Sequence, residues 1–129
     1  MKRIIATALV VVLMLSVSSV AFATYANYSG GASKSFDTYQ SLSRIGTSWS
    51  YARDECEYSA TAEDSPYASP HKSQMVSTGG VALSNQVEVW GGDICAMTWK
   101  SGAQNYTSAK MRLSAISSYF YAVGKFHAA

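Results

Sequence analysis

The sequence has little charge and few of the residues that form metal or redox centres. Only 14% of its 129 residues are charged, and it contains two cysteines, two histidines and two prolines. The net charge of +2 comes from Lys2 and Arg3, because the ten basic residues fall to eight beyond Arg3 and then equal the eight acidic residues. Binding to nucleic acid or to an anionic membrane surface needs an excess of lysine and arginine. We therefore expect no nucleic acid partner.

Motifs of the common catalytic sites are also absent. The chain has no G-x-S-x-G element, no H-E-x-x-H zinc helix and no phosphate-binding glycine loop. His71 and His127 are scattered relative to the cysteines and do not show the paired spacing of metal ligands. The acidic residues Glu63 and Asp64 precede His71 in a serine-rich loop, where such groupings arise by chance. We expect a protein that is not an enzyme and that has no metal and no cofactor.

The N-terminus holds the only long apolar run. A short basic start precedes residues 4–15, which are almost all apolar, and Ala21 and Ala23 frame a small-x-small cleavage site. This layout predicts a signal-peptide helix over residues 1–23, with cleavage after Ala23. The alternative is an uncleaved membrane anchor, since residues 4–23 are about long enough to span a bilayer. No later segment is long and apolar enough, so we expect a secreted, extracellular protein without a membrane span after cleavage.

The two cysteines, Cys56 and Cys95, are expected to form a disulfide. Lone thiol pairs in an oxidising compartment usually join. The link would close a loop of about 40 residues and contribute roughly 4 kcal/mol of stability. Both cysteines share a face with apolar or aromatic neighbours, so we expect the bridge to run through the core and to connect two sheets. A redox pair is the alternative, although the C-x-x-C spacing that lowers a thiol pKa is missing.

Alternation of apolar and polar residues predicts an all-β fold. Residues 24–34 are small, polar and rich in glycine, which is typical of a flexible lead-in. Residues 35–129 form a single domain in which the period of two dominates and turn signals recur. Residues 63–72 contain both prolines and are expected to be a loop. The pattern predicts a small antiparallel β-sandwich or barrel of about seven strands.

Three stretches refine this prediction. Residues 81–100 alternate on either side of a Gly-Gly-Asp turn and predict a β-hairpin. Residues 107–123 fit both a helical stripe and a strand alternation; we favour two strands with a turn near residues 117–118, because Tyr, Phe and Val follow that turn. The residues expected on the inner face are at odd positions over residues 45–51 and at even positions over residues 56–62. This switch predicts a bulge or a turn across residues 52–55.

Aromatic residues are the feature most suggestive of function. The chain has nine tyrosines, three tryptophans and four phenylalanines, and all but Phe22 follow the predicted cleavage site. Trp49 and Tyr51 share one strand face, as do Tyr119 and Tyr121, so these pairs could form an exposed recognition surface. The alternative is that the rings fill the core and its rim.

These observations favour a non-catalytic binding or interaction module at or outside the cell surface. Its partner would be a cell-envelope glycan or another protein, because exposed tyrosine and tryptophan suit both kinds of surface. A secreted bacteriocin-like antagonist of other cells is the alternative, on the basis of the small size and the leader. The sequence identifies neither the ligand nor the oligomeric state.

Overall fold

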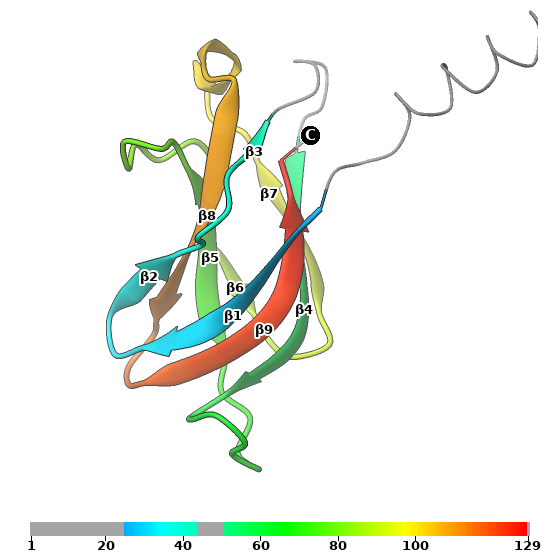
Figure 1. The fold of residues 1–129 in the computed structure, drawn as a ribbon, viewed down its shortest axis with the longest axis vertical. Coiled ribbons are helices and arrows are strands. Elements are labelled where there is room, and N and C mark those ends of the chain that lie inside the picture. Colours follow the sequence, from blue (N-terminus) through cyan, green and yellow to red (C-terminus); the bar gives the residue numbers. More distant parts are fainter. Residues whose placement is uncertain (1–24, 44–50, 129) are drawn as a thin grey trace, which may run out of the picture.

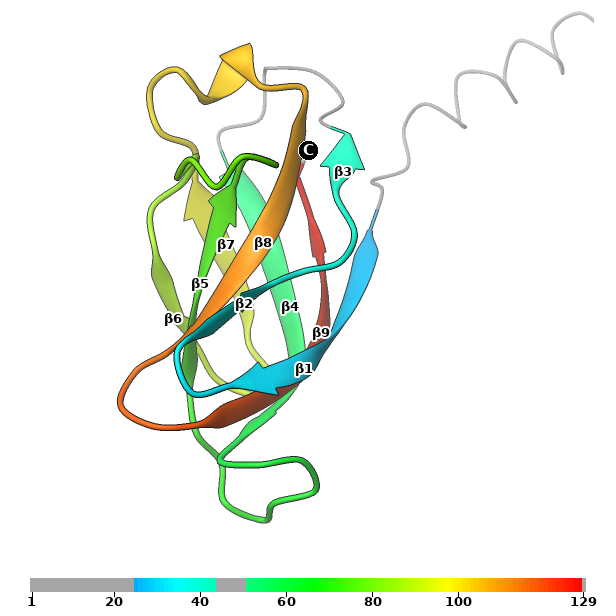
Figure 2. The same cartoon turned by 60° about the vertical axis from the view of Figure 1, so that its left-hand side comes forward.

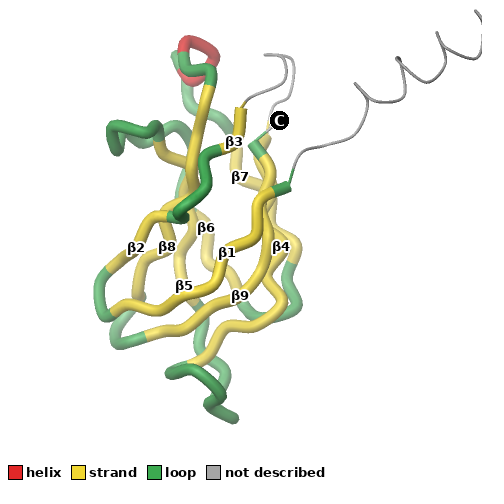
Figure 3. The backbone as a smooth tube through the Cα atoms, in the orientation of Figure 1, coloured by secondary structure: helices red, strands yellow, loops and turns green. Residues whose placement is uncertain are grey.

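The computed structural model describes residues 25–43 and 51–128. These residues form nine strands and one short 3₁₀ helix (Figure 3). The elements are β1 (Ala26–Ala32), β2 (Ser35–Asp37), β3 (Leu42–Ser43), β4 (Tyr51–Ala60), β5 (His71–Val76), β6 (Val87–Val89), β7 (Ile94–Thr98), η1 (Ala103–Asn105), β8 (Ser108–Ala115) and β9 (Phe120–His127).

The strands form two antiparallel sheets (Figures 1 and 2). The first sheet has the order β1-β9-β4-β7, and the second has the order β2-β8-β5-β6 with β3 also paired to β8. Consecutive strands belong to different sheets at every connection except β2 to β3 and β5 to β6, so the chain changes sheet six times among the described strands. The predicted all-β, antiparallel architecture is confirmed.

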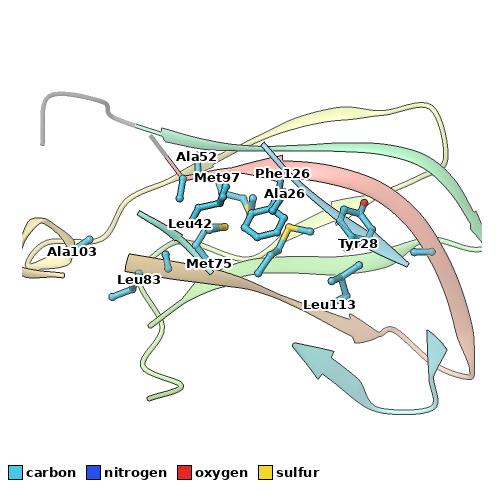
Figure 4. Close-up of a cluster of buried hydrophobic side chains, with 14 of the residues drawn as sticks. Ala26, Tyr28, Leu42, Ala52, Met75, Leu83, Met97, Ala103, Leu113 and Phe126 are labelled. Atoms are coloured by element: carbon cyan, nitrogen blue, oxygen red, sulfur yellow. The ribbon is translucent and has the colours of Figure 1, made fainter. Parts of the chain in front are cut away.

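The hydrophobic core lies between the inner faces of the two sheets (Figure 4). Phe120 and Phe126 of β9 face Met75 of β5 and Met111 and Leu113 of β8, and all five are almost completely buried. Burying each of these side chains contributes about 2–3 kcal/mol. Alternate residues of β8 and β9 are inward, as the sequence alternation predicts.

The strand interpretation of residues 107–123 is confirmed, and the helix alternative is wrong. β8 ends at Ala115, a bend covers residues 116–118, and β9 begins at Phe120. The polar side chains of Lys110 and Arg112 lie on the outer side of β8, where both form ion pairs with Asp37 of β2. Because a helix would place these residues on different sides, the polar alternation was the decisive signal.

The segment predicted as a flexible lead-in contains a strand. β1 pairs with β9 along its full length, from Ala26 opposite Phe126 to Ala32 opposite Phe120. Ala26 and Tyr28 are buried in the core. The prediction for residues 24–34 was therefore wrong over β1, because small and glycine residues also suit a strand that lies close against its neighbour.

The hairpin predicted over residues 81–100 is also wrong. β6 pairs with β5 in the second sheet, whereas β7 pairs with β4 in the first. Between the two arms the pairing is limited to an isolated bridge between Ser84 and Trp99, beside which the Thr98 amide also donates to the Asn85 side chain. The turn at residues 91–93 exists, but it carries the chain from one sheet to the other instead of joining two paired strands.

The predicted disulfide is not present, since Cys56 and Cys95 are both free cysteines. They do not lie across the core from each other, because β4 and β7 are neighbours in the same sheet and Asp54, not Cys56, is opposite Cys95. The Cys56 thiol points to the carbonyl oxygens of Tyr58 and Val123, at 3.3 and 3.8 Å. The signal-peptide helix over residues 1–23 and the cleavage residues Ala21 and Ala23 lie outside the described residues.

A β-bulge interrupts the pairing of β4 with β9. Cys56 is opposite Gly124 and Tyr58 is opposite Val123, so Glu57 is the extra residue. The phase change expected within residues 52–55 therefore occurs a few residues later. The backbone of β9 lies very close to its neighbours here, because a Cβ at Gly124 would be 2.5 Å from the carbonyl oxygen of Glu55 and 2.6 Å from the Tyr28 hydroxyl.

We predict that Gly124→Ala lowers the free energy of unfolding by about 1–3 kcal/mol, because the backbone carbonyl of Glu55 cannot move aside without disturbing the ladder. Gly79→Ala is the control, since its Cβ would meet only the Ser77 hydroxyl at 3.8 Å and should change stability by less than about 0.5 kcal/mol. Urea unfolding measures both. Equal stabilities of the two variants would contradict the close approach.

Candidate functional site

A carboxylate lies at the centre of the polar groups inside the sandwich. Asp54 of β4 has no exposed surface, and its two oxygens accept hydrogen bonds from Tyr28 of β1 at 2.8 Å and Ser73 of β5 at 2.7 Å. Burial, followed by the negative charge of Asp54, raises the pKa of Tyr28 far above its usual value. The phenol therefore stays protonated and remains a donor to the carboxylate.

His71 of β5, in the second sheet, lies beside this network and bonds to Ser59 of β4. The Ser59 hydroxyl donates to the carbonyl oxygen of Ser69 at 2.5 Å and so accepts from Nδ1 of His71 at 2.9 Å. Nε2 of the same ring lies 3.7 Å from Oδ2 of Asp54 and has no hydrogen-bond partner among the described residues. The ring also stacks on Phe120, with 5.4 Å between centroids.

Ser59, His71 and Asp54 are the residue types of a serine nucleophile, its base and an orienting acid. Their geometry differs from that role, because the Ser59 proton is directed to a backbone carbonyl and not to the imidazole. All three side chains are at most 3% exposed, so an external substrate cannot reach the hydroxyl. We interpret the group as a structural network that ties the two sheets together.

His127 occupies a different part of the molecule. It is opposite Arg53 near the start of β4, it is buried, and its ring packs edge-on against Tyr25 with 5.0 Å between centroids. Burial, and then the positive charge of Arg53, lower the pKa of His127, while Glu55 opposes the shift. The folded protein therefore favours the neutral form of His127. The contribution of this residue to the free energy of unfolding is fully present above about pH 6.5, the pKa of histidine in the unfolded chain, and is lost as the pH falls below that value.

An open cleft lies on the outside of the sandwich, next to the bulge in β4. The turn at residues 90–93 forms its first wall and is hydrogen-bonded to β4. The Gly92 amide donates to the carbonyl oxygen of Cys56, and the Cys56 amide donates to the carbonyl oxygen of Asp93. The Trp90 amide donates to the Asp93 carboxylate at 3.0 Å. A Cβ at Gly91 would be 3.0 Å from the Ser59 amide nitrogen, so the turn rests directly on the strand.

The loop between β4 and β5 forms the opposite wall. The Tyr58 hydroxyl donates to the carbonyl oxygen of Ser65 at 2.7 Å, and the Ser65 hydroxyl bonds to Thr61 at 2.8 Å and accepts from the Tyr67 amide at 3.1 Å. The loop is therefore folded back on itself. Both walls are fixed by hydrogen bonds before any ligand arrives.

The cleft has a volume of about 250 Å³. Residues 57–60 of β4 form its floor, Ser65, Pro66 and Ala68 line the loop side, and Trp90 and Gly91 line the turn side. The Trp90 side chain is 43% exposed, and its indole nitrogen donates to Glu88 at 3.3 Å. The ring is thus held in place while still accessible to solvent.

The structure describes three of the four residues of the predicted aromatic surface. Trp49 lies outside the described residues, and Tyr51 is opposite Thr98 at the start of β4, whereas Tyr121 is opposite Ala60 at its end. Tyr51 and Tyr121 therefore do not form one platform. Tyr119 is exposed in the preceding turn.

Tyr121 instead contacts a residue that the sequence interpretation did not select. Its ring meets Tyr58 edge-on, with 6.2 Å between centroids, and Tyr58 lines the cleft. The interpretation also did not select Trp90, and it took Glu57 to be part of a solvated face. A tryptophan beside a Gly-Gly-Asp turn is an available signal for an exposed ring, but its closeness to β4 depends on the sheet pairing.

No profile of a known protein family, no curated protein and no solved structure matches this chain. Residues 25–43 and 51–128 contain no helix with the length and apolarity needed to cross a bilayer. In the same residues, no three metal-binding side chains of the His, Cys, Asp or Glu types come together. Neither histidine lines the cleft.

We predict that Asp54→Ala lowers the free energy of unfolding by about 3–5 kcal/mol, because it leaves the buried Tyr28 and Ser73 hydroxyls without an acceptor. Glu63→Ala, which removes an exposed carboxylate, should change stability by less than about 0.5 kcal/mol. Chemical denaturation followed by tryptophan fluorescence measures both. A loss below about 1 kcal/mol for Asp54→Ala would show that the network is not structural.

We predict that alkylation of the native protein labels Cys95 at least about tenfold faster than Cys56 near neutral pH. Cys56 is buried, and burial raises its pKa to about 11, whereas Cys95 is partly exposed. Peptide mass spectrometry of the iodoacetamide-treated protein measures the two rates. Labelling that requires prior reduction would instead demonstrate a cross-link and contradict the free thiols.

Proposed function

We propose that the chain is a secreted, non-catalytic binding module that acts at or outside the cell surface and recognises a glycan of the cell envelope. The observation that carries this proposal is the open cleft with Trp90 on one wall and Tyr58 at its floor. Sugar rings have apolar faces that pack on exposed aromatic rings, while their hydroxyls bond to nearby polar groups, and tyrosine and tryptophan provide both features.

The rigidity of the cleft supports binding. Hydrogen bonds from the backbone hold the Trp90 turn on β4, and the Tyr58 hydroxyl holds the loop on the other side. A site that is already ordered loses less conformational entropy when its ligand binds. The size also fits, because a cleft of about 250 Å³ is smaller than most drug-binding pockets and suits a single ring of a longer chain.

Secretion is supported by the sequence of residues 1–23, whose basic start, apolar run and small-x-small site follow the signal-peptide layout. A binding module that leaves the cell would meet the polysaccharide of the cell envelope directly. The absence of an accessible nucleophile among Ser59, His71 and Asp54 is consistent with binding without turnover.

We predict that purified protein is retained on insoluble cell-envelope polysaccharide and that Trp90→Ala lowers its affinity at least about tenfold, equivalent to about 1.4 kcal/mol. Tyr39→Ala is the matched control, because Tyr39 is an aromatic residue that is 98% exposed and lies outside the cleft. Pull-down isotherms measure the affinities, and circular dichroism checks folding. No retention of the wild-type protein, or equal retention of the Trp90→Ala variant, would refute the proposal.

A further inference from the structure

One acidic residue lines the cleft, and four more lie close in sequence to residues that line it. Glu57 lines it from the bulge, and Glu88 holds the Trp90 indole in place. Further acidic residues belong to the two walls, with Asp93 in the turn and Glu63 and Asp64 in the loop. Five of the eight acidic residues of the chain therefore lie in the segments that build this one cleft or next to them.

None of these five carboxylates forms an ion pair with a lysine or arginine among the described residues. The other surface carboxylates are both neutralised, Asp37 by Lys110 and Arg112 and Glu55 by Arg53 and Lys125. Lys72 is opposite Glu88 in the register of β5 and β6, but it forms no ion pair with it. No lysine or arginine of residues 25–43 and 51–128 lines the cleft. The cleft is therefore negative, and it disfavours phosphate or carboxylate ligands.

We infer that the ligand carries a positively charged amine, and that the cleft selects an amino sugar with a free amino group over the same sugar in its N-acetylated form. This inference rests on the proposed function and adds the substrate class. An ammonium group in the cleft can gain a cation–π contact with the exposed Trp90 ring and a charge-assisted hydrogen bond to Glu57, because both residues line the cleft. An N-acetyl group is neutral and gains neither.

The size of the cleft agrees with this assignment. A volume of about 250 Å³ accommodates one ring, so one amine can reach Glu57 while the apolar side of the sugar contacts Trp90. Asp93 is engaged with the Trp90 amide and orients the wall. Glu57 is exposed and lies at the bulge, so it is the carboxylate available to the ligand.

The test compares two oligosaccharides with the same skeleton: a glucosamine oligomer with free amines and its fully N-acetylated counterpart. Titration calorimetry on the purified protein should give at least about tenfold tighter binding of the free-amine oligomer. Glu57→Gln should reduce this preference below about threefold and leave the affinity for the N-acetylated oligomer unchanged. Glu55→Gln is the matched control, because Glu55 is on the same strand and already paired with lysine and arginine.

The outcomes separate the inference from the proposed function. Equal binding of both oligomers that is lost in Trp90→Ala would overturn the amine preference and leave the glycan-binding proposal standing. Tighter binding of the N-acetylated oligomer, or an equal loss for both oligomers in Glu57→Gln, would also overturn the inference. Failure of both oligomers to bind, together with no retention on envelope polysaccharide, would remove the proposed function as well.

Discussion

The interior carboxylate of Asp54 is the constraint on which the sandwich depends. It accepts from Tyr28 of its own sheet and from Ser73 of the opposite sheet, and it has no contact with solvent. A buried carboxylate is unfavourable unless its oxygens are hydrogen-bonded. Any arrangement that separates these three residues would leave a charge unsatisfied in the core, so the carboxylate favours one register of the two sheets.

The bulge at Glu57 connects this interior to the outer surface. Asp54 and Cys56 face inward before the bulge, and Ser59 faces inward after it, which leaves Tyr58 on the outer face opposite Val123. The inserted residue thus lets one strand contribute a hydroxyl to the His71 network and a ring to the cleft. Bulges are common beside functional sites for this reason, because they change the direction of a side chain.

The sequence was informative where structure is local. Alternation over residues 107–123 predicted both strands and the turn between them correctly. It failed where partners are distant in the chain: residues 24–34 gave no sign that Tyr28 would be covered by the other sheet, and residues 81–100 indicated a turn but not the strands on which each arm would pair. The position of Trp90 over β4 follows from that pairing, so the cleft could not be predicted.

The pairing of β1 with β9 also has a kinetic consequence. Ala26 is opposite Phe126, so β1 has no partner in its sheet until the ribosome has synthesised β9, 100 residues further along the chain. Contacts this distant in sequence make folding slow, on the order of milliseconds to seconds for sandwiches. The nascent chain therefore cannot adopt its native sheet topology before β9 has been synthesised.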